Sequence, residues 1–520
     1  MRAGSAGCRP DLRHHTLAIR PVGERVPCRR ARCKSTANRF QPRLSGFHPT
    51  QCRAARSRSK PMQDVISRQR AYFDTNVTKP ISFRIEQLLR LKRALEQREG
   101  VLQEAIAADY GKQRYETFIT ELLPVYSEID AAIANVAAWS TPSPVASSPF
   151  TSPGRCYVMP EPLGVSLVIG PWNYPVQLTI VPAVGALAAG CTVVLKPSEI
   201  TANTSAAIAN LIAEAFDPAY VTVVEGGVRE TSALLAHKFD MIFFTGSVAV
   251  GRIVYQAAAK NLTPVVLELG GKSPTIVAPD ANLPLAARRI AWAKFLNAGQ
   301  TCIAPDYVNV HRSIYEEFLD ALAKEIAASR YGLENHNFVR IVNARNLERV
   351  AALIDQRKVF TGGLVDVDQR VIAPTVLRDV NWGDRVMGEE VFGPVLPTLV
   401  YDDIDDVVSQ IKQRDKPLAL YLFTEDAGTK RKILSDLSFG GGAINDAVVQ
   451  VTNGDLPFGG VGTSGIGSYH GEAGFRSFSH YKSIVDREAL TTAEEQQFRY
   501  SPYNDDYLKI MRQTLGIRPG

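Results

Sequence analysis

Short apolar runs alternate with a helical pattern between residues 165 and 267, and this alternation constrains the fold more than any other feature. The apolar runs predict strands at residues 165–169, 192–195, 221–224, 241–244 and 265–267. A helix is expected at residues 205–216, and strands separated by helices indicate βαβ units in a parallel sheet. Such sheets bind ligands beyond the carboxyl ends of their strands. The polar motifs of this region follow strand ends, which predicts a binding site there.

Two polar residues, Lys196 and Glu199, come directly after the second strand. A carboxylate in this place can accept hydrogen bonds from both ribose hydroxyls of an adenosine, and a lysine can approach the ribose or the phosphates. For an isolated Lys-Pro-Ser-Glu motif, an exposed ion pair that caps a helix is the commoner explanation.

A glycine turn, Gly246 to Gly251 with Ser247 inside it, follows the fourth strand and enters a helix. The N-terminus of a helix attracts a pyrophosphate through its free N–H groups. The turn is not the GxGxxG fingerprint, and glycine at a strand–helix turn is common. On its own, this turn is therefore weak evidence for a nucleotide.

Two further strand ends carry groups suited to catalysis. Asn173 can donate its amide to a developing oxyanion, although it could equally be a turn residue held between Trp172 and a proline. Glu268 ends an apolar strand and is followed by Gly270 and Gly271, which let a ligand approach the backbone closely. This glutamate is either a general base facing a cleft or a core-edge residue in a salt bridge.

Cys302 differs from the other six cysteines, because small and polar residues surround it in the stretch 297–305. A thiol needs room around its sulfur to attack a carbonyl, and nearby backbone N–H groups can lower its pKa and hold an oxyanion. A structural cysteine usually lies in an apolar run, as Cys191 does. The surroundings of Cys302, together with Glu268 upstream, indicate a nucleophile.

The framing of this cysteine and glutamate resembles the aldehyde dehydrogenase superfamily. Further motifs of that family follow in order, at residues 388–394 and 456–471, and Phe478-Ser479-His480 comes after them. Their spelling resembles the class-three-like branch, which acts on fatty or aromatic aldehydes. The resemblance extends over about residues 65–505. One departure is Thr301, where many relatives carry an apolar residue.

The resemblance implies roles for further residues. Glu390 would bind the hydroxyls of the nicotinamide ribose, and Phe392 would pack against the nicotinamide side. Trp172 and Leu269 would belong to the same cofactor site. A Gly246–Gly251 turn in place of GxGxxG is typical of the family's variant Rossmann domain. The expected cofactor is NAD, with NADP as an alternative, and no metal site is predicted.

The same resemblance implies a mechanism. The Cys302 thiolate attacks the aldehyde, and Asn173 and the Cys302 N–H stabilise the oxyanion. Loss of hydride to the nicotinamide leaves a thioester, which water activated by Glu268 hydrolyses to a carboxylic acid. The alternatives are a coenzyme-A-acylating dehydrogenase, a cysteine hydrolase or acyltransferase with a histidine partner, and a catalytically silent binding protein. Retention of Glu268 favours the hydrolytic dehydrogenase.

The expected fold is α/β: a variant Rossmann cofactor domain, an α/β catalytic domain and a small β element for oligomerisation. Helices are expected at residues 81–102 and 116–139, and a later strand at 395–400. The Pro- and Ser-rich segment from residue 140 is either a linker or a hairpin, and the resemblance favours the hairpin. The predicted divisions are 62–139 with 160–267 for the cofactor domain, 268–478 for the catalytic domain, and 140–159 with 479–505 for the oligomerisation element. A homodimer is the family expectation.

Charge is distributed unevenly along the chain. Residues 1–61 carry a net charge of +13, against +6 for all 520 residues, so the remainder carries −7. A mildly acidic folded part gives no support for nucleic-acid binding. The basic segment is either an organelle transit peptide or a leader upstream of a start at Met62.

Location is the least constrained property. The most apolar stretch, residues 165–195, is interrupted by three prolines, so no membrane anchor is expected. No secretory signal is visible, and the cysteines follow no disulfide pattern. These features predict a cytoplasmic protein, with organelle import through residues 1–61 as the alternative.

Overall fold

The computed structural model describes residues 62–148, 150–487 and 497–518, and its first sheet contains the predicted strands. These strands are β3 (Val165–Ile169), β4 (Thr192–Lys196), β5 (Val221–Val223), β6 (Met241–Thr245), β7 (Val265–Glu268) and β17 (Gly465–Ile466). The sheet order is β17-β7-β6-β3-β4-β5, parallel throughout except for the antiparallel pair β17–β7. The predicted parallel sheet is thus confirmed. Strand β17 escapes prediction because two residues, one of them glycine, carry no periodicity.

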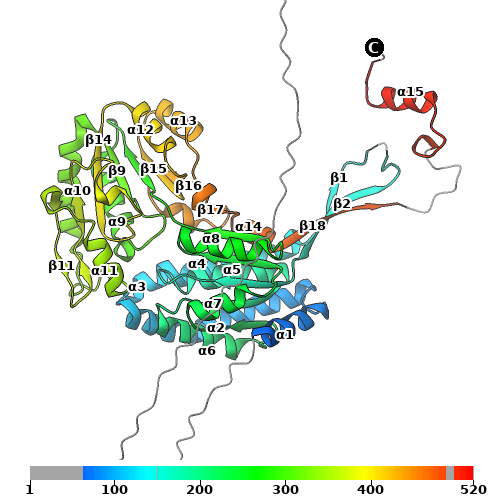
Figure 1. The fold of residues 1–520 in the computed structure, drawn as a ribbon, viewed down its shortest axis with the longest axis horizontal. Coiled ribbons are helices and arrows are strands. Elements are labelled where there is room, and N and C mark those ends of the chain that lie inside the picture. The colour runs from blue at the N-terminus through cyan, green and yellow to red at the C-terminus, as the bar shows by residue number, and fades with distance from the viewer. Residues whose placement is uncertain (1–61, 149, 488–496, 519–520) are drawn as a thin grey trace, which may run out of the picture. The chain divides into compact units, whose positions relative to one another are not determined.

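Helices cover both faces of this sheet (Figure 1). They are α1 (Met62–Asp74), α2 (Ile81–Tyr110), α4 (Leu123–Trp139), α5 (Gln177–Ala189), α6 (Ala202–Ala215), α7 (Val228–Leu235) and α8 (Val248–Ala259). Strand β4 shows how the faces divide, because its side chains alternate. Val193 and Leu195 pack in one core with α2, α4, α5 and α6, whereas Val194 packs in another with α1, α7 and α8.

Two helical features differ from the expectation. The helix predicted at 81–102 continues to Tyr110 and ends at Gly111, whose φ of 80° is left-handed. The helix predicted at 116–139 is interrupted: α3 (Arg114–Thr117) passes through a π turn, η1 (Phe118–Leu122), into α4. Helix α5 is buried on all sides, so its sequence lacks the polar face that would reveal a helix.

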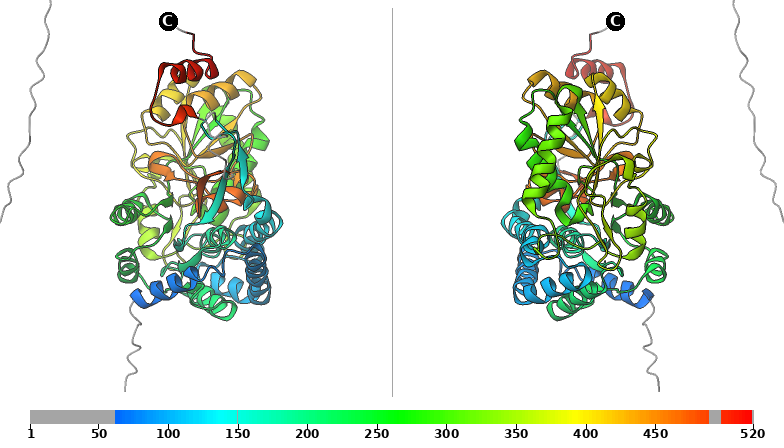
Figure 2. Two further views of the ribbon diagram at one scale, coloured as in Figure 1. Left: turned by 90° about the vertical axis from the view of Figure 1, so that its right-hand side faces the viewer. Right: turned by 90° about the vertical axis from the view of Figure 1, so that its left-hand side faces the viewer.

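A second, seven-stranded sheet follows in the chain. Its strands, in sheet order, are β10 (Val359–Thr361), β13 (Thr375–Leu377), β14 (Val395–Tyr401), β9 (Tyr307–His311), β8 (Pro274–Val277), β15 (Ala419–Phe423) and β16 (Gly441–Ile444). Helices α9 (Leu283–Phe295), α10 (Tyr315–Ser329), α11 (Ala344–Ala351), α12 (Ile404–Lys412) and α13 (Ala427–Asp436) accompany it. Figure 2 shows this sheet and the six-stranded one from two sides. In this sheet only β10 and β13 pair antiparallel, and two mostly parallel sheets with flanking helices confirm the α/β class.

A third, three-stranded sheet contains the segment that is Pro- and Ser-rich. Strands β1 (Ser143–Val145) and β2 (Arg155–Pro162) form an antiparallel hairpin. β18 (Ser479–Asp486) pairs with β2 along its whole length. The hairpin is confirmed and the linker alternative is wrong. Strand β18 follows α14 (Gly471–Ser477), and the last described helix is α15 (Asp505–Thr514).

Some predictions fall outside the described residues or stay untested. The basic segment 1–61 lies outside them, as do residues 488–496 of the predicted oligomerisation element. The division into three functional domains stays a prediction. None of the helices in the described part of the chain is both long and apolar enough to cross a membrane.

Candidate active site

The register of the six-stranded sheet brings the predicted site residues together. Ile169, at the end of β3, pairs with Lys196 on one side and with Phe244 on the other. At the end of β6, Thr245 pairs with Glu268. The strands therefore stop at one level, and the loops that follow them meet at one edge of the sheet.

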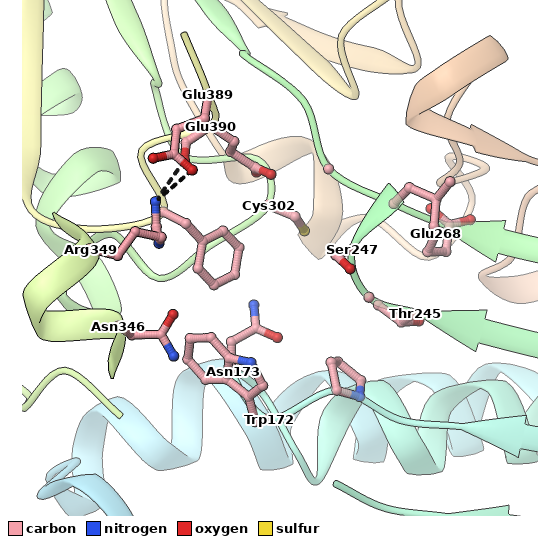
Figure 3. Close-up of a pocket in the computed structure, with 15 residues that line it drawn as sticks. Trp172, Asn173, Thr245, Ser247, Glu268, Cys302, Asn346, Arg349, Glu389 and Glu390 are labelled. Carbon is pink, nitrogen blue, oxygen red and sulfur yellow. Dashed lines mark hydrogen bonds and ion pairs between the residues drawn. The ribbon is translucent and has the colours of Figure 1, made fainter. Parts of the chain in front are cut away.

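A cavity of about 320 Å³ lies at this edge. Its lining residues are Pro171, Trp172, Asn173, Thr245, Gly246, Ser247, Glu268, Leu269, Gly270, Cys302, Asn346, Arg349, Glu389, Glu390 and Phe392. Figure 3 shows Cys302 between Glu390 on one side and Glu268 on the other, with Asn173 nearby. All three predicted catalytic residues therefore face the same space.

Cys302 follows a strained loop. Asn297, Ala298 and Gly299 have φ angles of 53°, 51° and 70°, in the left-handed region. Only glycine fits at the third position, because a Cβ on Gly299 would collide with the backbone carbonyl of Gly393. Strain of this kind persists where the surrounding structure enforces it, and it clusters at functional sites.

The surroundings keep the Cys302 thiol protonated. Burial raises its pKa to about 12, and the charges of Glu390 and Glu268 add to the shift. Backbone N–H groups lower the pKa, as the sequence analysis expects, but burial outweighs them. For the sulfur to act as a nucleophile, a base would have to accept the thiol proton.

Asn173 is held at its side chain and at its backbone. Its side-chain amide donates to the carbonyl of Gln300 at 3.0 Å. Its own carbonyl accepts from Asn297 Nδ2 at 3.0 Å and from the Tyr110 hydroxyl at 3.1 Å. An amide nitrogen has two N–H groups, so one fixes the orientation of the side chain and the other is left for a ligand.

Glu268 is 2% exposed, and neither of its carboxyl oxygens has a hydrogen-bond partner within the described residues. Burial raises its pKa well above the usual value. A buried polar group without a partner requires an explanation. Glu268 is one of the residues that line the cavity, although both carboxyl oxygens are buried, and a raised pKa makes its carboxylate a stronger base.

Glu390 lies on a loop that is anchored from two sides. Lys272 donates to the carbonyl of Glu389 at 2.8 Å and pairs with Asp306. Arg349 donates to the carbonyl of Glu390 at 3.2 Å and lies 3.5 Å from the carboxylate of Glu389 (Figure 3). Burial and the charge of Asp306 raise the pKa of Glu390 to about 8.

Three predicted cofactor residues do not line the cavity. Lys196 is buried and donates to the carbonyl of Pro197 at 2.6 Å, with Glu199 at 3.7 Å. Glu199 is half exposed, which leaves its carboxylate free to meet a ligand. Gly251 allows the helix to pack closely against Leu269, because a Cβ at this position would lie 2.6 Å from the Leu269 side chain.

Sequence reasoning missed four polar residues of the cavity: Thr245, Glu389, Asn346 and Arg349. Thr245 and Glu389 directly adjoin predicted residues. Asn346 and Arg349 lie three positions apart on α11 and so share one face of that helix. That spacing was the available signal, but an i, i+3 polar pair on a surface helix is too common to single out.

The residues that line the cavity suit the nicotinamide end and a phosphate of a nicotinamide dinucleotide. Trp172 and Phe392 contact each other edge to face, with ring centroids 5.4 Å apart, and present flat apolar surfaces. Ser247 caps α8, and the lining residues Thr245 to Ser247 place the N-terminus of this helix at the cavity, where it favours an anionic group such as a phosphate.

Comparison with protein families decides the assignment. The model of the aldehyde dehydrogenase family matches residues 42–484. This chain belongs to the aldehyde dehydrogenase family. The resemblance seen in its motifs is therefore confirmed, and the chain is an oxidoreductase.

Individual aldehyde dehydrogenases match 85% of the chain. The 4,4'-diaponeurosporen-aldehyde dehydrogenase of Staphylococcus aureus is 44% identical over 446 residues, covering 85% of this chain and 96% of the relative. A mouse enzyme named dimeric, NADP-preferring aldehyde dehydrogenase is 45% identical, with 85% and 98% covered. Aldehyde dehydrogenase family 3 member A2 of Pongo abelii is 41% identical, with 85% and 91% covered.

Solved structures of aldehyde dehydrogenases share the fold. The substrate-bound state of Staphylococcus aureus AldH superimposes with a TM-score of 0.85 at 41% identity, covering 87% of this chain and 99% of the other. A Mycobacterium tuberculosis aldehyde dehydrogenase complexed with NAD+ gives 0.75 at 29% identity, with 83% and 91% covered. The expected cofactor, NAD or NADP, agrees with these names.

Proposed function

We propose that this aldehyde dehydrogenase oxidises medium- or long-chain aliphatic or aromatic aldehydes to carboxylic acids with NAD+ or NADP+. The observation that carries the proposal is that Cys302, Glu268 and Asn173 line one cavity. The names of the relatives support an aldehyde as the substrate, 4,4'-diaponeurosporen-aldehyde among them.

The first step forms a bond between the sulfur of Cys302 and the aldehyde carbon. Because the thiol is protonated, a base takes its proton, and Glu268 is the unpartnered carboxyl in the cavity. The free N–H of Asn173 and the backbone N–H of Cys302 then donate to the oxyanion of the thiohemiacetal.

The nicotinamide cofactor, when bound, accepts the hydride that leaves the thiohemiacetal. Glu390, Phe392 and Trp172 would hold its nicotinamide end, and Ser247 and Glu199 its phosphate and adenosine end. The oxidised carbon remains on Cys302 as a thioester.

The last step hydrolyses this thioester. Glu268 first releases the Cys302 proton to solvent and then takes a proton from a water molecule. The water oxygen attacks the thioester carbon, and the sulfur leaves as the thiolate. The products are a carboxylic acid and the free cysteine. A carboxyl with a raised pKa and two oxygens free of partners suits this role.

We further propose a homodimer formed through β1, β2 and β18. The name of the mouse relative supports a dimer, and several side chains of this sheet are exposed, Val145 and Val485 among them. Light scattering on the full chain measures the mass directly, and a monomer at micromolar concentration would contradict the proposal.

The decisive experiment follows reduced-cofactor absorbance with the full chain. NAD and NADP are tested against hexanal, a long-chain aldehyde and benzaldehyde. Cys302→Ala should abolish turnover, while Cys156→Ala, at a buried cysteine on β2, serves as the matched control and should retain it.

A second variant separates the two half-reactions. Glu268→Gln should release at most one equivalent of reduced cofactor and then stop: the release is slow because water must take the Cys302 proton in place of Glu268, and turnover stops because the thioester is not hydrolysed. Steady turnover in this variant would contradict the role of Glu268. Acid formation that requires coenzyme A would instead support the acylating alternative.

A further inference from the structure

A buried ion pair lies behind the catalytic cavity, outside the residues that line it. Lys112 Nζ lies 3.0 Å from Glu121 Oε1, and both side chains are 0% exposed. Removing two charges from water costs several kcal/mol per ion, and packed apolar residues often stabilise a fold as well. The pair is therefore not explained by stability alone.

The contacts of Glu121 lead to the turn that carries Asn173. Its second oxygen, Oε2, accepts from the backbone N–H groups of Val176 and Gln177 at 3.0 and 3.1 Å. These two residues begin α5, directly after the turn. Glu121 is thus a carboxylate cap for α5 that is supplied by another helix.

Tyr110 provides a second connection. Its hydroxyl lies 3.3 Å from Glu121 Oε1 and 3.1 Å from the carbonyl of Asn173, and its one proton is shared between them. Lys112 also contacts this turn, with its Nζ 4.3 Å from the centroid of the Tyr174 ring. Tyr174 in turn bonds Thr301, next to the nucleophile, at 2.6 Å.

The π turn η1 explains how two residues of one helical segment, Glu116 and Glu121, both contact the loops around the cavity. Residues five apart in an α-helix point about 140° away from each other. In η1 the N–H of Leu123 bonds to the carbonyl of Phe118, five residues back, so the turn is wider. As a result Glu121 reaches the turn that carries Asn173. Glu116 reaches the loop that precedes Cys302, where it accepts from the backbone N–H of Asn297 at 2.9 Å.

We propose that Glu121, neutralised by Lys112, is a positioning residue for the reaction, because it fixes the turn that aims Asn173 at the oxyanion. Glu121 touches neither the substrate nor the cofactor. It acts through the backbone of residues 173–177 and through Tyr110. The inference rests on the proposed function, in which Asn173 donates to the oxyanion.

The test is a double-mutant cycle with the full chain. Glu121→Gln preserves the shape but loses one acceptor and the charge, and it should lower kcat about tenfold while KM changes less than about twofold. In an Asn173→Ala background the same substitution should change kcat less than about twofold, because the residue it positions is gone.

A second readout separates positioning from general damage to the site. Alkylation of Cys302 by iodoacetamide needs no oxyanion donor, so its rate in Glu121→Gln should stay within about twofold of the wild type. If Glu121→Gln does not fold, Tyr110→Phe tests the same connection, with kcat expected about threefold lower. Tyr220→Phe is its control: the Tyr220 hydroxyl is buried and has no partner within the described residues.

Three results would overturn the inference: an unchanged kcat in both Glu121→Gln and Tyr110→Phe, an equal loss in the Asn173→Ala background, or a parallel loss of Cys302 alkylation. A wild type that oxidises no aldehyde would instead overturn the proposed function itself. The two failures are therefore distinguishable.

Discussion

The side-chain amide of Asn173 donates to the backbone carbonyl of Gln300 at 3.0 Å, and this bond ties the end of β3 to the loop that carries Cys302. The two residues are 127 positions apart in the chain. Together with the bond from Asn297 Nδ2 to the Asn173 carbonyl and the bond between Tyr174 and Thr301, this bond fixes the position of Asn173 relative to Cys302, although the two residues adjoin strands of different sheets.

Removal of this amide gives the first prediction. Asn173→Ala should lower kcat by about 100- to 1000-fold, as the loss of one oxyanion donor typically does. The backbone carbonyl of residue 173 keeps its two hydrogen-bond donors, Asn297 and Tyr110, so we expect the variant to fold like the wild type. Steady-state kinetics and a thermal melt check both statements. Asn309→Ala, at a buried asparagine on β9, is the control and should keep its kcat.

The second prediction concerns the close approach of Gly270 to the Glu390 carboxylate. A Cβ on Gly270 would collide with the Glu390 carboxylate. Gly270→Ala should therefore weaken cofactor binding by about tenfold or more, equivalent to about 1.4 kcal/mol. Gly100→Ala, in the middle of α2 with open space around it, should leave binding unchanged. Fluorescence titration with the reduced cofactor measures both, and equal affinities would refute the proposed role of Glu390.

The third prediction concerns pH. The charge of Glu390 helps to raise the pKa of Cys302 to about 12, after burial. Since a negative neighbour disfavours the thiolate, Glu390→Gln should lower this pKa and speed alkylation of Cys302. Glu390 itself has a pKa of about 8, so the difference should appear above pH 8, where the wild-type carboxylate is charged.

Iodoacetamide alkylation between pH 7 and pH 10, without cofactor, measures this shift. The rate at pH 9 should rise about threefold or more in Glu390→Gln. Glu317→Gln, at an exposed position on α10, should match the wild type. A slower reaction in Glu390→Gln would mean that Glu390 assists the thiolate rather than opposing it.

The fourth prediction concerns cofactor preference. Glu199 presents a half-exposed carboxylate after β4, where it would accept from the adenosine ribose and repel a 2′-phosphate. Glu199→Gln should raise the ratio of kcat/KM for NADP over NAD by about tenfold, equivalent to about 1.4 kcal/mol. Glu214→Gln, on the exposed side of α6, should leave the ratio unchanged. An unchanged ratio in Glu199→Gln would place the adenosine elsewhere.

Local pattern was sufficient for much of the fold and the cavity. The parallel sheet follows from short apolar runs, and Asn173, Glu268 and Cys302 stand out because turn or small residues frame each of them. Elements without a periodic pattern of apolar residues could not be predicted: α5 is buried on every side, and β17 is two residues long. Asn346 and Arg349 escaped because their helix reaches the cavity through tertiary packing.

By itself, the sequence determined which groups are available for chemistry: a thiol in a small-residue loop, a carboxyl and an amide at strand ends, and a glycine turn before a helix. The tertiary structure alone decided how reactive they are. Burial raises the pKa values of Cys302 and Glu268, and Glu121, a residue of the π turn, accepts from the backbone that follows Asn173. Solvation and contact depend on atoms that are distant in the chain, so a linear pattern does not encode them.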